Sequence, residues 1–126
     1  IYQLIIFNYK WNQIMPSLII YIEENLDRNA NFTELEDVEH KLIQTITKEL
    51  EAKKDNCQIV WIYSKILTSK YKVFGELKFR DTKNRDDIKK EKCLEKIGEI
   101  LKNKFNVKIR LRSFAINDSL ITALDL

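Results

Sequence analysis

The residues of this chain best suited to bind a ligand are its lysines and arginines. Fifteen of the 22 lie between Lys70 and Arg112, a stretch that holds only seven acidic residues. A local excess of positive charge attracts anions such as nucleic acid, an anionic membrane or an acidic protein surface. The charge pattern therefore predicts a class of partner, and it indicates no reaction.

Six of these basic residues alternate with apolar residues in two segments, 71–80 and 106–116. Such alternation is typical of strands with one buried face and one face in water. Phosphates bind cations and unstacked bases stack on aromatic rings, so the two polar strand faces predict a nucleic-acid-binding surface. The alternative is a solvated sheet face whose lysines discourage edge pairing. The predicted binding residues are Lys72, Phe74, Lys78, Arg80, Lys108, Arg110 and Arg112.

One of these segments, KVFGELKF at 72–79, resembles the octapeptide of RNA-recognition-motif domains. Val73 stands where that pattern has a glycine, and Glu76 stands where it has a stacking aromatic residue. The resemblance covers eight residues and implies that Phe74 stacks on a base. Glu76 implies a weakened stacking platform, or protein binding in place of RNA binding. The matching residues are Lys72, Phe74, Gly75, Leu77 and Phe79.

The pair Glu76 and Lys78 also resembles the E-x-K element of the PD-(D/E)xK nucleases. In the chemistry that this resemblance implies, a carboxylate holds a divalent metal and a lysine steadies the attacking water or the phosphate. Asp55 is the candidate for the upstream acid, and a helical acid such as Glu39 could complete the set. An ion pair on the sheet is the alternative interpretation.

Other metal or nucleophile chemistry lacks suitable residues. Cys57 and Cys93 are not part of a CxxC motif, and His40 is the only histidine, so a zinc site of Cys and His lacks its usual four ligands. We interpret the two cysteines as free thiols and His40 as a surface residue. The sequence therefore predicts no metal site and no cofactor.

Hydrophobic periodicity predicts the elements of the first half of the chain. Residues 1–8 are rich in β-branched and aromatic residues, which favours a buried strand, with a short helical turn as the alternative. Residues 16–27 carry apolar residues at helical spacing after Pro16, a residue that suits the first turn of a helix. Residues 33–53 form a second predicted helix with a capping box at its start.

The second half predicts three strands and one helix. Residues 57–63 are typical of a well-buried strand. The short linker to the strand at 71–80 predicts an antiparallel hairpin of the two. Asp86 and Asp87 are N-cap candidates for a long helix. The segment 106–116 is the last predicted strand.

The predicted order β-α-α-β-β-α-β is typical of ferredoxin-like folds, in which helices cover one face of an antiparallel sheet. The 126 residues suit one α+β domain, residues 1–126, and we expect it to be part of a larger protein or complex. The most apolar stretch, 1–22, is interrupted by polar residues and resembles neither a membrane helix nor a signal peptide. We therefore expect an intracellular protein without a membrane partner.

Together these patterns predict a non-enzymatic module that binds nucleic acid, RNA rather than DNA, or another polyanion, or that assembles with protein subunits of a complex. The first alternative is a metal-dependent nuclease domain that uses Asp55, Glu76 and Lys78. The second is a protein-interaction subunit with an acidic partner.

Overall fold

The computed structural model describes residues 16–26 and 32–126 of the chain. In this part, two β-α-β units follow one another. A short 3-10 turn lies within the first unit, between its helix and its second strand, and another follows the second unit. The elements are β1 (Ser17–Glu23), α2 (Phe32–Glu49), η1 (Lys54–Asn56), β2 (Gln58–Ser64), β3 (Val73–Arg80), α3 (Asp87–Phe105), β4 (Ile109–Ile116) and η2 (Asp118–Leu120).

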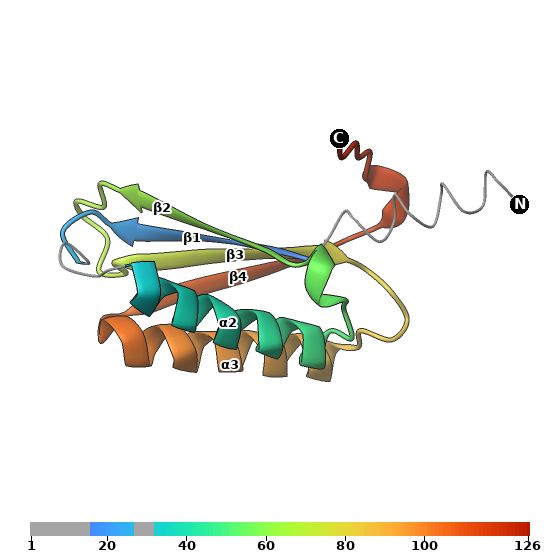
Figure 1. The fold of residues 1–126 in the computed structure, drawn as a ribbon, viewed down its shortest axis with the longest axis horizontal. Helices are drawn as coiled ribbons and strands as arrows, with labels where there is room; N and C mark the ends of the chain where they lie inside the picture. Colours follow the sequence, from blue (N-terminus) through green and yellow to red (C-terminus); the bar gives the residue numbers. More distant parts are fainter. Residues whose placement is uncertain (1–15, 27–31) are drawn as a thin grey trace, which may run out of the picture.

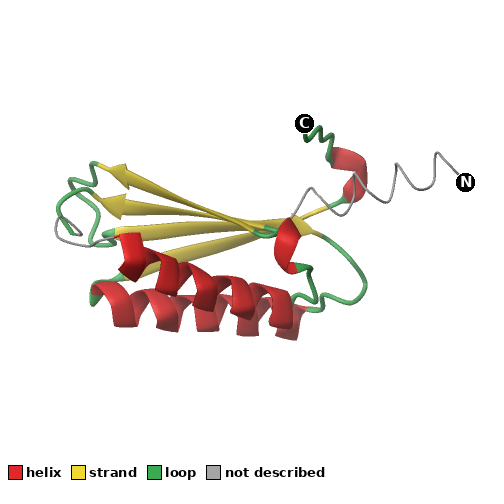
Figure 2. Cartoon of the chain, in the orientation of Figure 1, coloured by secondary structure: helices red, strands yellow, loops and turns green. Residues whose placement is uncertain are grey.

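The strands of the described residues form one sheet in the order β2-β1-β3-β4. Each β-α-β unit contributes a parallel pair, β1 with β2 and β3 with β4, and the two units meet through the antiparallel pair β1 and β3. Helices α2 and α3 lie side by side on one face of this sheet (Figure 1, Figure 2). The prediction of an α+β fold is confirmed, but among the described residues the sheet is mixed rather than antiparallel and two helices, not three, cover its face.

The ferredoxin-like topology is wrong. In that fold another strand splits each β-α-β unit within an antiparallel sheet, whereas here each helix connects two adjacent parallel strands. The predicted hairpin of 57–63 with 71–80 is also wrong, because β1 lies between β2 and β3. Pairing order depends on hydrogen bonds between distant segments, which local periodicity does not report.

The helix predicted at 16–27 is a strand. Along β1 the side chains of Leu18, Ile20 and Ile22 are buried toward the helices, and those between them are half-buried on the other face. A run that is apolar on both faces satisfies helical spacing and strand alternation equally. The abundance of β-branched residues is the signal that favours the strand. The predicted strand at residues 1–8 lies outside the described residues.

The two remaining helix predictions are confirmed. Helix α2 ends at Glu49, a few residues early, and Glu51 follows in the left-handed region with φ of 53°. Asp86 caps α3 by accepting a hydrogen bond of 2.9 Å from the backbone N–H of Lys89. Asn106 ends α3 in the left-handed conformation.

The predicted strands at 57–63, 71–80 and 106–116 correspond to β2, β3 and β4. The alternation of β3 is as predicted, with Val73, Leu77 and Phe79 buried. By contrast, β2 is the outermost strand of the described sheet, and it is not well buried: Ile62 and Tyr63 are 37% and 48% exposed.

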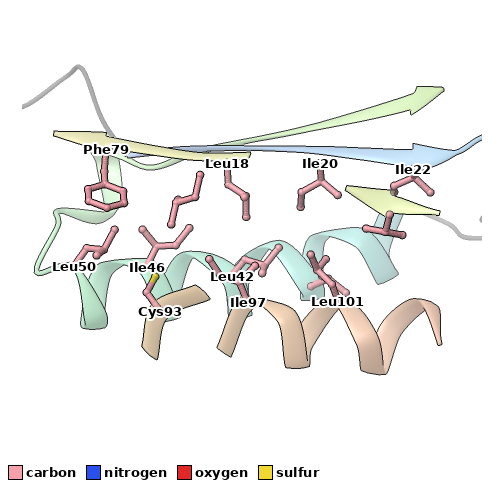
Figure 3. Close-up of a cluster of buried hydrophobic side chains, with 13 residues drawn as sticks. Leu18, Ile20, Ile22, Leu42, Ile46, Leu50, Phe79, Cys93, Ile97 and Leu101 are labelled. Atoms are coloured by element: carbon pink, nitrogen blue, oxygen red, sulfur yellow. The ribbon is translucent and has the colours of Figure 1, made fainter. Parts of the chain in front are cut away.

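The core lies between the sheet and the two helices (Figure 3). Phe79, Leu50 and Cys93 lie at the end where β1 begins, and Ile22 and Leu101 lie at the other (Figure 3). None of the described helices has the length and apolar character needed to cross a membrane.

Candidate active site

Five of the seven predicted nucleic-acid-binding residues lie on the sheet face opposite the helices: Phe74, Lys78, Arg80, Arg110 and Arg112. The register of β3 with β4 places Phe74 beside Arg110, and Lys78 beside Phe114. Their side chains, however, make contacts within the chain. Arg110 lies over the ring of Tyr71, at 4.4 Å from its centroid. Phe74 stacks on the ring of Tyr21 at 5.8 Å, so it is half-buried.

Further basic residues of the set are also engaged. The Lys72 Nζ donates to the backbone carbonyl of Ile66 at 2.9 Å, and the Arg112 guanidinium donates to the carbonyl of Leu111. Lys108 is exposed just before β4. The set is therefore a sheet face with largely internal contacts.

The structure does not assemble the predicted nuclease site. Glu76 pairs with Lys78 at 3.9 Å on the open sheet face. Glu39 accepts a hydrogen bond of 2.6 Å from the Trp61 indole N–H, on the helix-covered side. Asp55 is exposed in η1. Within 16–26 and 32–126, no group of three His, Cys, Asp or Glu side chains could hold a metal ion.

A different set of residues gathers at the end of the sheet where β1 begins. Pro16 directly precedes β1 and is fully buried. Its carbonyl accepts a hydrogen bond of 3.1 Å from the backbone N–H of Gln58, the first residue of β2. On the other side, Ser17 pairs with Lys78 of β3. Pro16 therefore lies at the centre of this edge, between the start of β2 and the end of β3.

The end of β3 brings a guanidinium to the same edge. Arg80 is the last residue of β3, and its Nε lies 3.2 Å from the Asp118 carboxylate in η2. The backbone N–H of Asp81 bonds the carbonyl of Ile116, which keeps the ends of β3 and β4 together. This ion pair fixes η2 beside the end of the sheet.

Arg85 adds a second, half-buried cation. Its guanidinium donates to the carbonyls of Leu50 at 2.9 Å and Arg80 at 2.7 Å, and lies over the Phe79 ring at 5.8 Å. Burial, and then the charge of Arg80, lower the pKa of Arg85. Burial and a neighbouring positive charge both destabilise a cation, so an anion that approaches Arg80 and Arg85 together would stabilise their charged forms. The edge is therefore suited to hold a carboxylate.

The nearby thiols are poor nucleophiles. Burial raises the pKa of Cys57 to about 11 and that of Cys93 to about 12. Both cysteines are free, and Cys93 is fully buried. Because the thiolate is the reactive form of cysteine, neither thiol suits covalent or base chemistry at neutral pH.

Comparison with known proteins finds no matching protein family and no matching curated protein. Solved structures do match. A cis-3-chloroacrylic acid dehalogenase family member, N1, is 13% identical with a TM-score of 0.69 over 86% of this chain and 80% of its own. Pt0534, in a structure inactivated by 2-oxo-3-pentynoate, is 8% identical with a TM-score of 0.71 over 86% and 92%. A fused 4-OT asymmetric trimer is 12% identical with a TM-score of 0.67 over 86% and 92%.

The chain has a tautomerase-like fold. The solved structures that share it include 4-OT and a member of the cis-3-chloroacrylic acid dehalogenase family, which are enzymes. This finding overturns the prediction of a non-enzymatic nucleic-acid-binding module, and with it the nuclease and acidic-partner alternatives. The basic strand faces misled the prediction because a one-sided sheet places charge on its open face whatever the function is.

Among the residues predicted from the sequence, Arg80 and Lys78 lie at the edge around Pro16, and Asp55 lies in η1, just before the start of β2. Pro16 itself was predicted as the first residue of a helix. One signal was present: the only proline of the chain directly follows its only methionine, Met15.

Proposed function

We propose that this chain is a tautomerase-type enzyme, and that its base is the amine of Pro16, freed when Met15 is removed as an initiator methionine. The observation that carries the proposal is the place of Pro16, at the centre of the sheet edge that also holds Arg80 and Arg85. The shared fold supports the reaction class.

The proposal requires a free amine. Inside a chain the proline nitrogen belongs to an amide, whose lone pair is delocalised into the carbonyl and does not accept a proton. A terminal α-amino group titrates at about pH 7.7–8.0, and apolar surroundings or nearby cations lower that pKa. An amine at position 16 would therefore be in part unprotonated near neutral pH, as a general base should be.

The reaction is a proton transfer next to a carbonyl. The Pro16 amine takes the proton from the carbon beside the carbonyl of a 2-oxo acid: the C–H bond breaks, an N–H bond forms, and the electron pair moves to the carbonyl oxygen as an enolate. The ammonium then returns the proton to the enolate oxygen, which gives the enol tautomer, and the reverse sequence converts the enol into the 2-oxo acid. Arg80 and Arg85 bind the carboxylate and stabilise the enolate charge.

We also propose that the enzyme is a homo-oligomer. The fused 4-OT neighbours are trimers. Large apolar side chains, among them Ile62 and Phe114, are exposed on the sheet face that carries no described helix. Contact between copies would remove this apolar surface from water.

The test uses 2-oxo-3-pentynoate, the compound that inactivates Pt0534. Its alkyne is conjugated to a ketone, so an amine adds to it: an N–C bond forms, one π bond of the alkyne breaks, and the amine proton passes to the neighbouring carbon. One preparation starts at Met15 and is processed to Pro16, and a second keeps residues before Pro16. Peptide mapping by mass spectrometry should find one adduct, on Pro16, in the first preparation alone.

A double variant, Cys57→Ser with Cys93→Ser, controls for modification of thiols. It should still form the adduct when its chain starts at Pro16. An adduct on another residue, or none on the processed amine, would contradict the proposed base.

A further inference from the structure

A groove of about 590 Å³ lies between α3 and β4, away from Pro16. Its apolar floor includes Leu94 and Gly98 of α3, and Ile109 and Leu111 of β4. The absence of a side chain at Gly98 deepens it, since a Cβ there would contact Leu111 at 3.5 Å. The charge of the groove changes along α3: the acidic Glu91 lines it near the start of the helix, and the basic Lys102 lines it near the end.

One wall of the groove is a strand edge. Among the described residues β4 is the outermost strand and pairs with β3 alone. The N–H and C=O groups along its other edge are therefore available to a further strand. A groove between a helix and an open strand edge is the geometry in which an extended peptide adds a strand, with backbone bonds to the edge and alternate side chains in the groove.

The C-terminal segment of the chain has the pattern of such a strand. Leu120, Leu124 and Leu126 are all more than 70% exposed. In an extended conformation of residues 121–126, Leu124 and Leu126 point to one side, and Ile121, Ala123 and Asp125 point to the other. One side of the segment thus carries its two leucines, and the other carries its single acidic side chain.

The two sides of the segment match the two sides of β4. Ile109 and Leu111 face α3, because they pair with the core-facing residues of β3, whereas Arg110 lies on the open face. A strand added to this edge with its leucines in the groove would place Asp125 on the open side near Arg110, and close to Lys108, which lines the groove where β4 begins. Opposite charges on neighbouring strands attract.

The lengths also agree. From Glu91 to Lys102 helix α3 rises roughly 17 Å at about 1.5 Å per residue. Residues 121–126 in an extended conformation span roughly 20 Å at about 3.4 Å per residue. An antiparallel orientation brings the end of the segment, with its acid, to the basic end of the groove.

We infer that residues 121–126 of a second copy add to β4 as an antiparallel strand, with Leu124 and Leu126 in the α3–β4 groove. In the structure the segment of the same chain lies beyond the end of the strands, on the side away from the helices (Figure 1), so we assign the groove to the segment of a second copy. The inference rests on the homo-oligomer of the proposed function, and it specifies one contact between its copies.

Sedimentation velocity over a concentration series tests this contact in the full chain. The double variant Leu124→Ser with Leu126→Ser should raise the dissociation constant of the assembly by about tenfold or more, since it removes the apolar anchors. The matched control is Leu67→Ser, which alters a leucine that is 83% exposed in another loop and should leave assembly unchanged. Equal assembly of the parent and the double variant would refute the contact.

A charge exchange tests the orientation. Asp125→Lys and Lys108→Asp should each weaken assembly by about threefold to fivefold, and the two together should restore it. Failure of the pair to restore assembly would refute the antiparallel placement. If the parent protein stays monomeric at all concentrations while residues 121–126 are protected from carboxypeptidase, the groove is occupied by the segment of the same chain. That result would refute the contact with a second copy.

The adduct on Pro16 gives an independent readout. The tail variants leave Pro16, Arg80 and Arg85 unchanged, so formation of the adduct reports the proposed base whether or not the copies assemble through the tail. Failure of one proposal is therefore distinguishable from failure of the other.

Discussion

Leu111 of β4 packs directly against Gly75 of β3. A Cβ at position 75 would lie 2.7 Å from the Leu111 Cδ2, closer than two carbon atoms can approach. Gly75 faces the core in the middle of the sheet. The glycine is therefore required by the packing of its neighbour, and this explains why a strand interior accepts a residue that normally weakens it.

We predict that Gly75→Ala lowers the free energy of unfolding by about 1–3 kcal/mol, because the leucine must move. Gly98→Ala is the matched control. Its Cβ would meet the same leucine at 3.5 Å, an ordinary contact, and alanine favours a helix by about 1 kcal/mol. The control should therefore be neutral or stabilising in urea unfolding. Equal destabilisation by both changes would contradict the packing of Leu111.

The pair Glu49 and Lys96, between α2 and α3, predicts a dependence of stability on pH. The hydrogen bond from Lys96 lowers the pKa of the buried Glu49 carboxyl. Because the folded-state pKa is lower than the unfolded one, about 4.3, the pair stabilises the fold above that value. The contribution is lost as the pH falls through the folded-state pKa. Melting temperatures from pH 7 to pH 3 should fall less in Lys96→Met than in the parent.

The exposed loop variant Lys83→Met is the control for the lost charge. It should keep the acid dependence of the parent. A Lys96→Met profile that runs parallel to the parent profile would show that the pair is not the cause.

The two thiols should react slowly. With the pKa of Cys57 near 11, its thiolate fraction at neutral pH is on the order of 100-fold below that of a free cysteine. A chromogenic disulfide reagent should therefore modify Cys57 slowly, and Cys93 only after unfolding. The variant Cys57→Ser isolates Cys93, and fast labelling of this variant in the native state would contradict its burial.

Arg85→Lys should destabilise the fold although it keeps the charge. Two different nitrogens of Arg85 donate to the carbonyls of Leu50 and Arg80, and a lysine ammonium does not reproduce that planar fork. We expect a loss of about 1–2 kcal/mol in urea unfolding. Arg112→Lys, at an exposed position, should change stability by less than about 0.5 kcal/mol. Equal effects would show that the fork is not needed.

Under the proposed function, Arg80→Gln should slow proton exchange. The assay follows by NMR the loss of hydrogen from the carbon beside the carbonyl of a 2-oxo acid in D₂O. We expect kcat/KM to fall by about tenfold or more, because a cation near the enolate is removed. Arg112→Gln, which replaces a basic residue of the same sheet face, should exchange at the parent rate. An equal fall in kcat/KM in both variants would show that the effect comes from the net charge of the protein and not from the position of Arg80.

Local periodicity alone predicted α2, α3, β3 and β4. Each has one buried face and one polar face, so the spacing of its apolar residues distinguishes a helix from a strand. The predictions of the cap at Asp86 and of the two faces of β3 were confirmed for the same reason, because both features depend on residues that are close together in the chain.

Tertiary structure decided the place of β1 and hence the candidate site. A strand with apolar residues on both faces carries no distinguishing period, and its position between β2 and β3 depends on backbone hydrogen bonds to segments about 40 and 55 residues away. Only that pairing puts Pro16 at the edge with Arg80 and Arg85. The sequence by itself determined that Arg80 and Arg85 are cationic and that Pro16 follows Met15. The pairing of the strands determined that Pro16, Arg80 and Arg85 lie at the same edge.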